Sequence, residues 1–145
     1  MNLLKEVKIT RVMNAQAAGT TDVNSNAVDM QGFESVLFVV AFGTIDAGAV
    51  TSIKVQESDD ASFSTAYDIE GSRVSIADDE DNKLLIIEVH KPLRRYVRVV
   101  VDRGTANAVI DGAIALQFGV GYLPVTQDST VAASELHVCP DEGTA

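Results

Sequence analysis

Apolar and polar residues alternate with a period of two along most of the chain. In Thr51–Glu57, Ile53 and Val55 fall on one side of the chain while Lys54 and Gln56 fall on the other. In an extended strand this spacing puts the apolar side chains on one face and the polar ones on the opposite face. The pattern therefore predicts strands that have one face in a core and the other toward water.

Three later segments, residues 85–90, 96–101 and 113–118, repeat this alternation. Their alternating large apolar residues are Leu85, Ile87, Val89, Val97, Val99, Val101, Ile114, Leu116 and Phe118. One segment differs, because Val36–Phe42 is apolar at every position. An uninterrupted apolar run is typical of a central strand that is covered on both faces. A neighbouring subunit can supply the second cover.

Short turn-forming segments separate these runs at intervals typical of a sandwich or barrel. They are Asp46–Gly48, Glu70–Ser72, Asp81–Asn82, Lys91–Pro92, Arg103–Gly104 and Asp111–Gly112. Amphipathic helix is nearly absent, and only Val131–Leu136 admits a turn or two. The sequence therefore predicts an all-β protein, a jelly-roll-like β-sandwich or barrel with extended terminal arms.

We expect residues 1–145 to form a single β domain whose ends differ from its middle. Residues 14–27 are small and polar, which predicts a loop or an arm. The alternating segment Val7–Val12 is expected to be the first strand of its own sheet, although it also suits addition to a neighbour's sheet edge. Residues 121–145 have weak periodicity and predict a weakly structured tail, frayed in a monomer and ordered on the next protomer in an assembly.

A formal net charge of −10 argues against nucleic acid and anionic membranes as partners, since a phosphate-binding surface has to carry positive charge. The single cysteine, Cys139, excludes an intrachain disulfide. The first residues lack the apolar stretch of a signal peptide, and the run Val36–Phe42 is too short to span a bilayer. We therefore expect synthesis and folding in a reducing cytoplasm.

Residues that could carry chemistry are few and scattered. His90, His137 and Cys139 offer neither a nucleophilic triad nor the four ligands of a structural zinc. Asp78–Asn82 does not fit a calcium-binding EF-hand, which leaves a hairpin tip as the main interpretation and a looser calcium loop as the alternative. Gly119–Gly121 lacks the third glycine of a dinucleotide motif. We expect no enzymatic activity, no catalytic residue, no metal and no cofactor.

Five of the eleven basic residues fall within thirteen positions of this acidic chain. They are Lys91, Arg94, Arg95, Arg98 and Arg103. In one interpretation they pair with acidic loops of the same chain across neighbouring strands. In the other they form a basic patch that contacts an acidic protein partner. These five residues are the candidate protein-contact site.

Three stretches resemble small structural proteins of tailed bacteriophages that are encoded near the major capsid protein. They are Glu34–Thr44, Val55–Asp60 with Ala66–Tyr67, and Arg95–Asn107. The resemblance covers about residues 30–145. Some proteins of this group are head decoration, or cement, proteins that form trimers with a jelly-roll-like body. The group has no active-site residue to transfer to this chain.

The resemblance implies a homotrimer on the outer surface of the phage head that binds the major capsid protein and stabilises the capsid. Such a protein is made in the cytoplasm of the host bacterium and ends on the virion. A tail, neck or head-completion component is an alternative. A carbohydrate-binding jelly roll is a further alternative, because Arg95–Val99 also resembles strands of those modules. It is disfavoured by the absence of tryptophan and the presence of only three tyrosines, Tyr67, Tyr96 and Tyr122.

Overall fold

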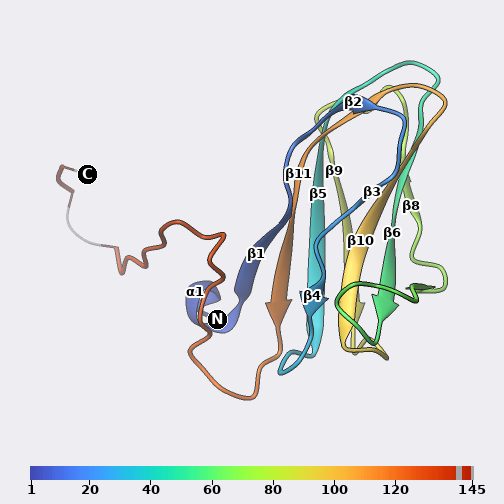
Figure 1. Ribbon diagram of the computed structural model, residues 1–145. Coiled ribbons are helices and arrows are strands. Elements are labelled where there is room, and N and C mark those ends of the chain that lie inside the picture. The colour runs from blue at the N-terminus through green and yellow to red at the C-terminus, as the bar shows by residue number, and fades with distance from the viewer. Residues whose placement is uncertain (140–141, 145) are drawn as a thin grey trace.

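The computed structural model describes residues 1–139 and 142–144, and two antiparallel sheets packed face to face form its body (Figure 1). The first, named here the β5 sheet, has the order β1-β11-β5-β9, with β2 also on β11. Its strands are β1 (Lys8–Met13), β2 (Gln16–Gly19), β5 (Ser35–Ile45), β9 (Leu84–His90) and β11 (Ala108–Phe118). The predicted β-sandwich is thus confirmed.

The second sheet, named the β6 sheet, has the order β3-β10-β6-β7, with β4 also on β10 and β8 also on β6. Its strands are β3 (Val23–Asn24), β4 (Val28–Asp29), β6 (Val50–Ser58), β7 (Tyr67–Asp68), β8 (Val74–Ile76) and β10 (Tyr96–Gly104). Within the two sheets, strands near the two ends of the chain pair with each other, and the pairs between them lie progressively closer together in sequence. β1 pairs with β11, β3 and β4 pair with β10, β5 pairs with β9, and β6 pairs with β7 and β8. A long hairpin rolled on itself gives this nesting, which is the topology of a jelly roll.

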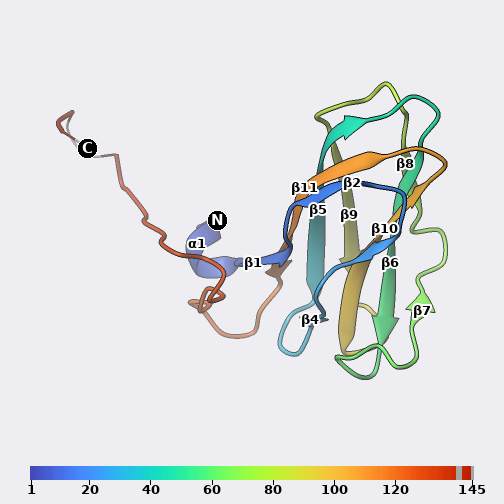
Figure 2. The ribbon, with the colours of Figure 1, turned by 45° about the horizontal axis from the view of Figure 1, so that its top comes forward.

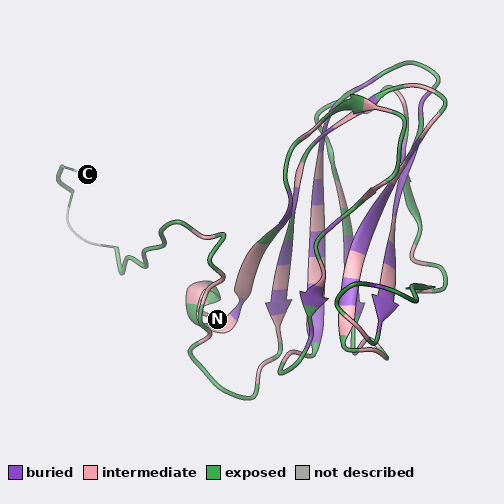
Figure 3. Ribbon diagram, viewed as in Figure 1, coloured by how far each residue is buried: buried purple, intermediate pink, exposed green. Residues whose placement is uncertain are grey.

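The core is made of buried residues from the strands of both sheets, and Figure 3 shows these buried positions along the ribbon of the sandwich. Strands β6, β9 and β10 follow the predicted alternation. In residues 113–118 of β11 the smaller residues at 113, 115 and 117 face inward instead, and the large apolar ones face out. Ala115 lies opposite Phe38, and Ala113 lies opposite Val40. Small residues beside large ones fill the space at the density of a protein interior, so the bulk of β5 decides which face of β11 is buried.

The N-terminal region follows the prediction in part. Residues 8–13 form β1, the first strand of the chain's own sheet, and pair with β11. Residues 14–27, expected to be a loop or arm, cross from one sheet to the other and carry β2 and β3 (Figure 2). A short helix, α1 (Leu3–Glu6), precedes β1 and was not predicted.

The turn or two of helix that the sequence admits at Val131–Leu136 does not form, because the structure assigns no helix to these residues. A helix this short is not stable in water unless an apolar face packs on something. Residues 119–139 contain neither helix nor strand. Residues 125–130 are hydrogen-bonded to residues 4–11, and the chain beyond them leads away from the sandwich in both views (Figures 1 and 2). The one helix of the described residues, α1, is too short to cross a membrane.

Candidate interaction surfaces

One of the two histidines is paired with a buried hydroxyl. Ser35 Oγ and His90 Nδ1 lie 2.6 Å apart across β5 and β9, a pair that the sequence analysis missed. Ser35 is 2% exposed, so its oxygen has no access to a substrate. No group of three His, Cys, Asp or Glu residues that could hold a metal ion occurs in the described part of the chain.

The acidic segment Asp78–Asn82 closes loops through its carboxylates. Asp78 accepts the backbone N–H of Gly48 at 2.6 Å, and Asp81 accepts that of Ile45 at 2.9 Å. Asn82 has a positive φ of 59°, a conformation that asparagine tolerates at a hairpin tip. This geometry favours the hairpin interpretation of the segment.

The five basic residues of the candidate contact site do not form one surface. Arg95 makes a bidentate pair with Asp29, with nitrogen–oxygen distances of 2.9 and 2.8 Å. This hydrogen-bonded guanidinium holds the pKa of the Asp29 carboxyl below its usual value. Arg94 pairs with Asp59, and its guanidinium lies 3.9 Å from the centre of the Tyr67 ring. Pairing with acidic residues of the same chain thus accounts for both.

Arg98 and Lys91 have other surroundings. Arg98 donates two hydrogen bonds to Gln56, at 3.0 and 2.8 Å, and lies 4.4 Å from the centre of the Phe63 ring. Burial in this position lowers the pKa of the Arg98 guanidinium. Lys91 makes no ion pair with any described residue. Contact of these two residues with a partner stays a prediction.

Arg103 lies at the other end of β10 and is buried, with 7% of its surface exposed. Its Nη1 donates to the carbonyls of Ala17 at 2.9 Å and Ala108 at 2.8 Å, and its Nε donates to that of Thr21 at 2.8 Å. One guanidinium therefore holds residues 17–21 against β11. The neighbouring Gly19 permits this, because a Cβ there would lie 3.0 Å from Nη2.

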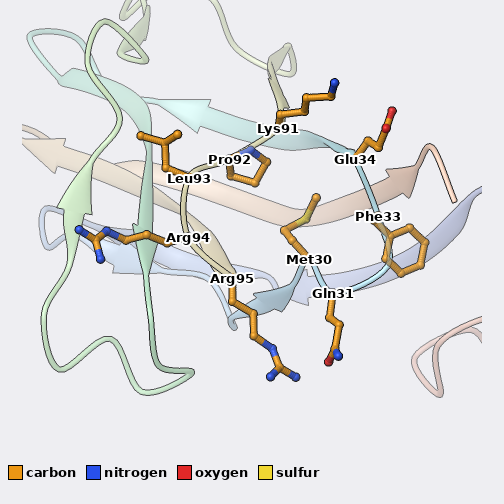
Figure 4. Close-up of a pocket in the computed structure, with 9 residues that line it drawn as sticks. All are labelled: Met30, Gln31, Phe33, Glu34, Lys91, Pro92, Leu93, Arg94 and Arg95. Atoms are coloured by element: carbon orange, nitrogen blue, oxygen red, sulfur yellow. The ribbon is translucent and has the colours of Figure 1, made fainter. Parts of the chain in front are cut away.

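An open depression lies between the chain segments 30–34 and 91–95 at one end of the sandwich (Figure 4). Figure 4 shows Met30 and Pro92 in its middle, while the side chains of Arg94 and Arg95 point away on two sides. Buried Glu57 fixes one wall by accepting the backbone N–H groups of Leu93 and Arg94 at 2.9 and 3.3 Å. The depression joins no set of converging reactive groups, and its exposed Leu93 suits contact with a protein surface.

The outer face of the β6 sheet, the polar face, carries side chains that bind one another. Lys54 donates to Asp68 at 2.9 Å, and Gln56 donates to the same carboxylate at 2.8 Å. Hydrogen bonds from Gln56 and then Lys54 lower the pKa of the Asp68 carboxyl. Arg73 binds both Ser52 and Asp102. The polar face is thus satisfied within the chain.

The outer face of the β5 sheet, the apolar face, has the opposite character. Strand register places its side chains in rows across β1, β11, β5 and β9. The apolar members of these rows are Ile9, Leu37, Val39, Ala41, Leu84, Ile86, Ile114 and Leu116. Leu84, Ile86 and Ile114 are 57%, 54% and 38% exposed. The fully apolar run predicted to be covered on both faces is therefore covered on one face only in this chain.

The tail is anchored at first and then projects from the body. Gln127 accepts the N–H of Ile9 at 2.8 Å and donates to the carbonyl of Val7 at 2.7 Å. Thr130 accepts the N–H of Arg11 at 2.9 Å. Beyond this point residues 131–139, named here the C-terminal arm, lead away from the sandwich (Figures 1 and 2). The hydrogen bonds described for residues 131–138 are local, and Val138 is 90% exposed.

These features define a jelly-roll β-sandwich with an uncovered apolar sheet face and a projecting arm. No protein-family model matches the chain, and no curated protein matches it significantly. Among solved structures it is similar to a protein from disulfide-linked pili, the endospore appendages of Bacillus. That likeness has a TM-score of 0.50 and 12% sequence identity, and it covers 81% of this chain and 91% of the pilus protein. At this identity the likeness shows the fold.

Proposed function

We propose that the chain is a structural protein of a bacteriophage virion that decorates the outside of the head and stabilises the capsid by binding the major capsid protein. The observation that supports this most directly is the C-terminal arm. An extended segment that leaves its own domain is suited to bind a neighbouring subunit, because it presents the exposed side chains of Leu136 and Val138 to that neighbour. Many copies on one lattice turn such small contacts into stable attachment.

The surface chemistry is compatible with this role. A net charge of −10 favours solubility at the high concentration that a decoration protein reaches before it is used. Lys91, Arg94 and Arg95 line the depression, and Arg98 lies on the outer face of β10; these four basic residues are the proposed points of contact with acidic groups of the capsid. Arg103 is left out of this set, because its guanidinium binds backbone carbonyls inside the chain.

The test is binding to purified, expanded heads of the phage that encodes the chain. We expect the full chain to sediment with heads at micromolar concentration, and a chain ending at Thr130 to lose at least tenfold in affinity. That truncation keeps Gln127 and Thr130 and so preserves the anchored part of the tail. A double substitution, Leu136→Asp with Val138→Asp, keeps the length of the arm and should weaken binding similarly. A full chain that ignores heads would overturn the proposal.

A filament subunit is the second candidate, and the fold likeness to the spore-appendage pilus protein favours it. Negative-stain electron microscopy of the purified chain separates the two, since a filament subunit polymerises without heads. A tail, neck or head-completion position is separated from the head surface by imaging virions that carry a labelled copy.

A further inference from the structure

We infer that the apolar face is a self-association surface on which a second copy of this chain packs face to face, with β1 of each copy over β9 of the other. The inference concerns the purified chain alone and does not rest on the proposed function. It starts from the contrast between the two outer sheet faces. The polar face satisfies its charges within the chain, whereas the apolar face presents large aliphatic side chains to solvent.

The extent of the apolar face argues for a partner. Four strands about 4.8 Å apart and three rows about 6.8 Å apart give roughly 300–400 Å² of mostly aliphatic surface. This is the size of the largest apolar patch on a typical monomeric protein, and such a patch is often a functional contact surface. Nothing described in this chain covers the patch, since Leu84 and Ile86 are both more than half exposed.

The chemistry of the molecule's other faces identifies the partner as a second copy. A flat aliphatic sheet face is best covered by a surface of the same kind, as in the aligned packing of two sheets. The chain's own polar face is unsuitable, because Lys54, Arg73 and Asp102 would lose water there without gaining partners. The matching surface is therefore the apolar face of another copy, which gives a two-fold, self-complementary contact.

Charged residues at opposite edges of the apolar face select the orientation, while a third, Asp111 of β11, lies near Arg11 and Leu84 on the same face. Arg11 lies on β1 at one edge of the face, in the row of Ile114, Val39 and Ile86. Glu88 lies on β9 at the opposite edge, one row away from Ile86. Neither residue forms an ion pair within the described part of the chain.

A two-fold axis parallel to the strands places β1 of one copy over β9 of the other. Arg11 of each copy then faces β9 of the other copy. Glu88 lies one row along that strand from the facing position, and a long side chain spans this distance. The axis across the strands would instead put β1 over β1 and bring the two Arg11 side chains together. Opposite charges across an interface fix its register, so the first arrangement is favoured.

The contact area predicts a reversible dimer. The face supplies about half of the roughly 800 Å² per partner found in standard interfaces, so we expect dissociation on dilution. Analytical ultracentrifugation over a wide concentration range should show a species of 15.4 kDa passing into one of twice that mass. A single 15.4 kDa species up to about 100 µM, or the trimer that the phage resemblance implies, would overturn the inference.

Substitutions locate the contact. Ile86→Glu should raise the dissociation constant of the dimer at least tenfold, whereas Val50→Glu, at a 67% exposed position of β6, should leave it unchanged. Leu84→Lys repeats the test at a second exposed position, and circular dichroism shows whether each variant is folded. A dimer that survives both β9 changes but is lost when residues 131–145 are removed would assign the contact to the tail and overturn the inference.

A charge exchange tests the orientation. Glu88→Arg should weaken the dimer, Arg11→Glu should weaken it too, and the two changes together should restore it. Recovery in the double variant supports the arrangement of β1 over β9. Failure to recover, in a dimer that Ile86→Glu still dissociates, would overturn that arrangement.

Discussion

Replacement of Arg103 by methionine should destabilise the fold, because this guanidinium joins residues 17–21 to β11. The change keeps a long aliphatic side chain but leaves three backbone carbonyls without their donor. Ala108 is fully buried, so its carbonyl cannot turn to water, while the exposed Ala17 and Thr21 can. A buried acceptor without a partner costs about 1–3 kcal/mol, and the two exposed bonds add less. We expect a total loss of about 2–4 kcal/mol.

Urea denaturation followed by circular dichroism measures this loss, and thermal unfolding should show a drop of roughly 10 °C for a domain of this size. The matched control is Arg95→Met, which removes an exposed pair with Asp29 and should cost under about 1 kcal/mol. Gly19→Ala acts on the same guanidinium from the other side, since its Cβ would lie 3.0 Å from Nη2. Equal stability losses for Arg103→Met and Arg95→Met would refute this role for Arg103.

Three further predictions concern the core, the carboxylates and the tail. Phe38→Ala, at a position with 0% exposure, should lower the free energy of unfolding measured in urea by about 3–5 kcal/mol. Ile86→Ala, measured at high dilution, should lower it by less than about 1 kcal/mol. Similar losses for the two variants would contradict the assignment of the two faces. The carboxyl groups of Asp29 and Asp68 have lower pKa values in the folded state than in the unfolded state. Their contribution to the stability of the fold is therefore present above the unfolded pKa and should be lost as pH falls below about 4. A urea midpoint unchanged down to pH 3 would contradict this. Gln127→Ala should release residues 125–130 from β1. Hydrogen exchange of the Ile9 amide should then be faster, with little change in global stability. Unchanged exchange would show that Gln127 does not hold the tail.

The alternation of apolar and polar residues predicted most strands, because burial of one sheet face imposes a period of two on the sequence. It could not predict which face of β11 is buried. Ala113, Ala115 and Gln117 have the weaker apolar character, yet they lie inside, where Val40 and Phe38 on β5 fill the space beside the two alanines. Which face of β11 is buried depends on the order of the strands in the sheet, and the local pattern of apolar and polar residues does not contain that order.

The basic cluster shows a similar limit. Five residues close in sequence suggested one patch, but Arg98 points to the outer face of β10 while Arg103 points inward, where it binds carbonyls of residues 17 and 21. Spacing along a strand predicts which side chains share a face, and the odd interval between these two residues already placed them on opposite faces. Two of the three partners of Arg103 could not be predicted, since they come from a segment more than 80 positions away.

The tail also determines where a neighbouring strand can be added. A free sheet edge offers unpaired N–H and C=O groups to any extended chain. On β1 the N–H groups of Ile9 and Arg11 already donate to Gln127 and Thr130, so the chain's own residues 125–130 protect this edge. The other edge of the β5 sheet is β9, whose outer side has no strand partner in the described residues. If the C-terminal arm of one copy adds to the β5 sheet of another, β9 is the edge that remains for it, beside the apolar face to which Leu84 and Ile86 belong.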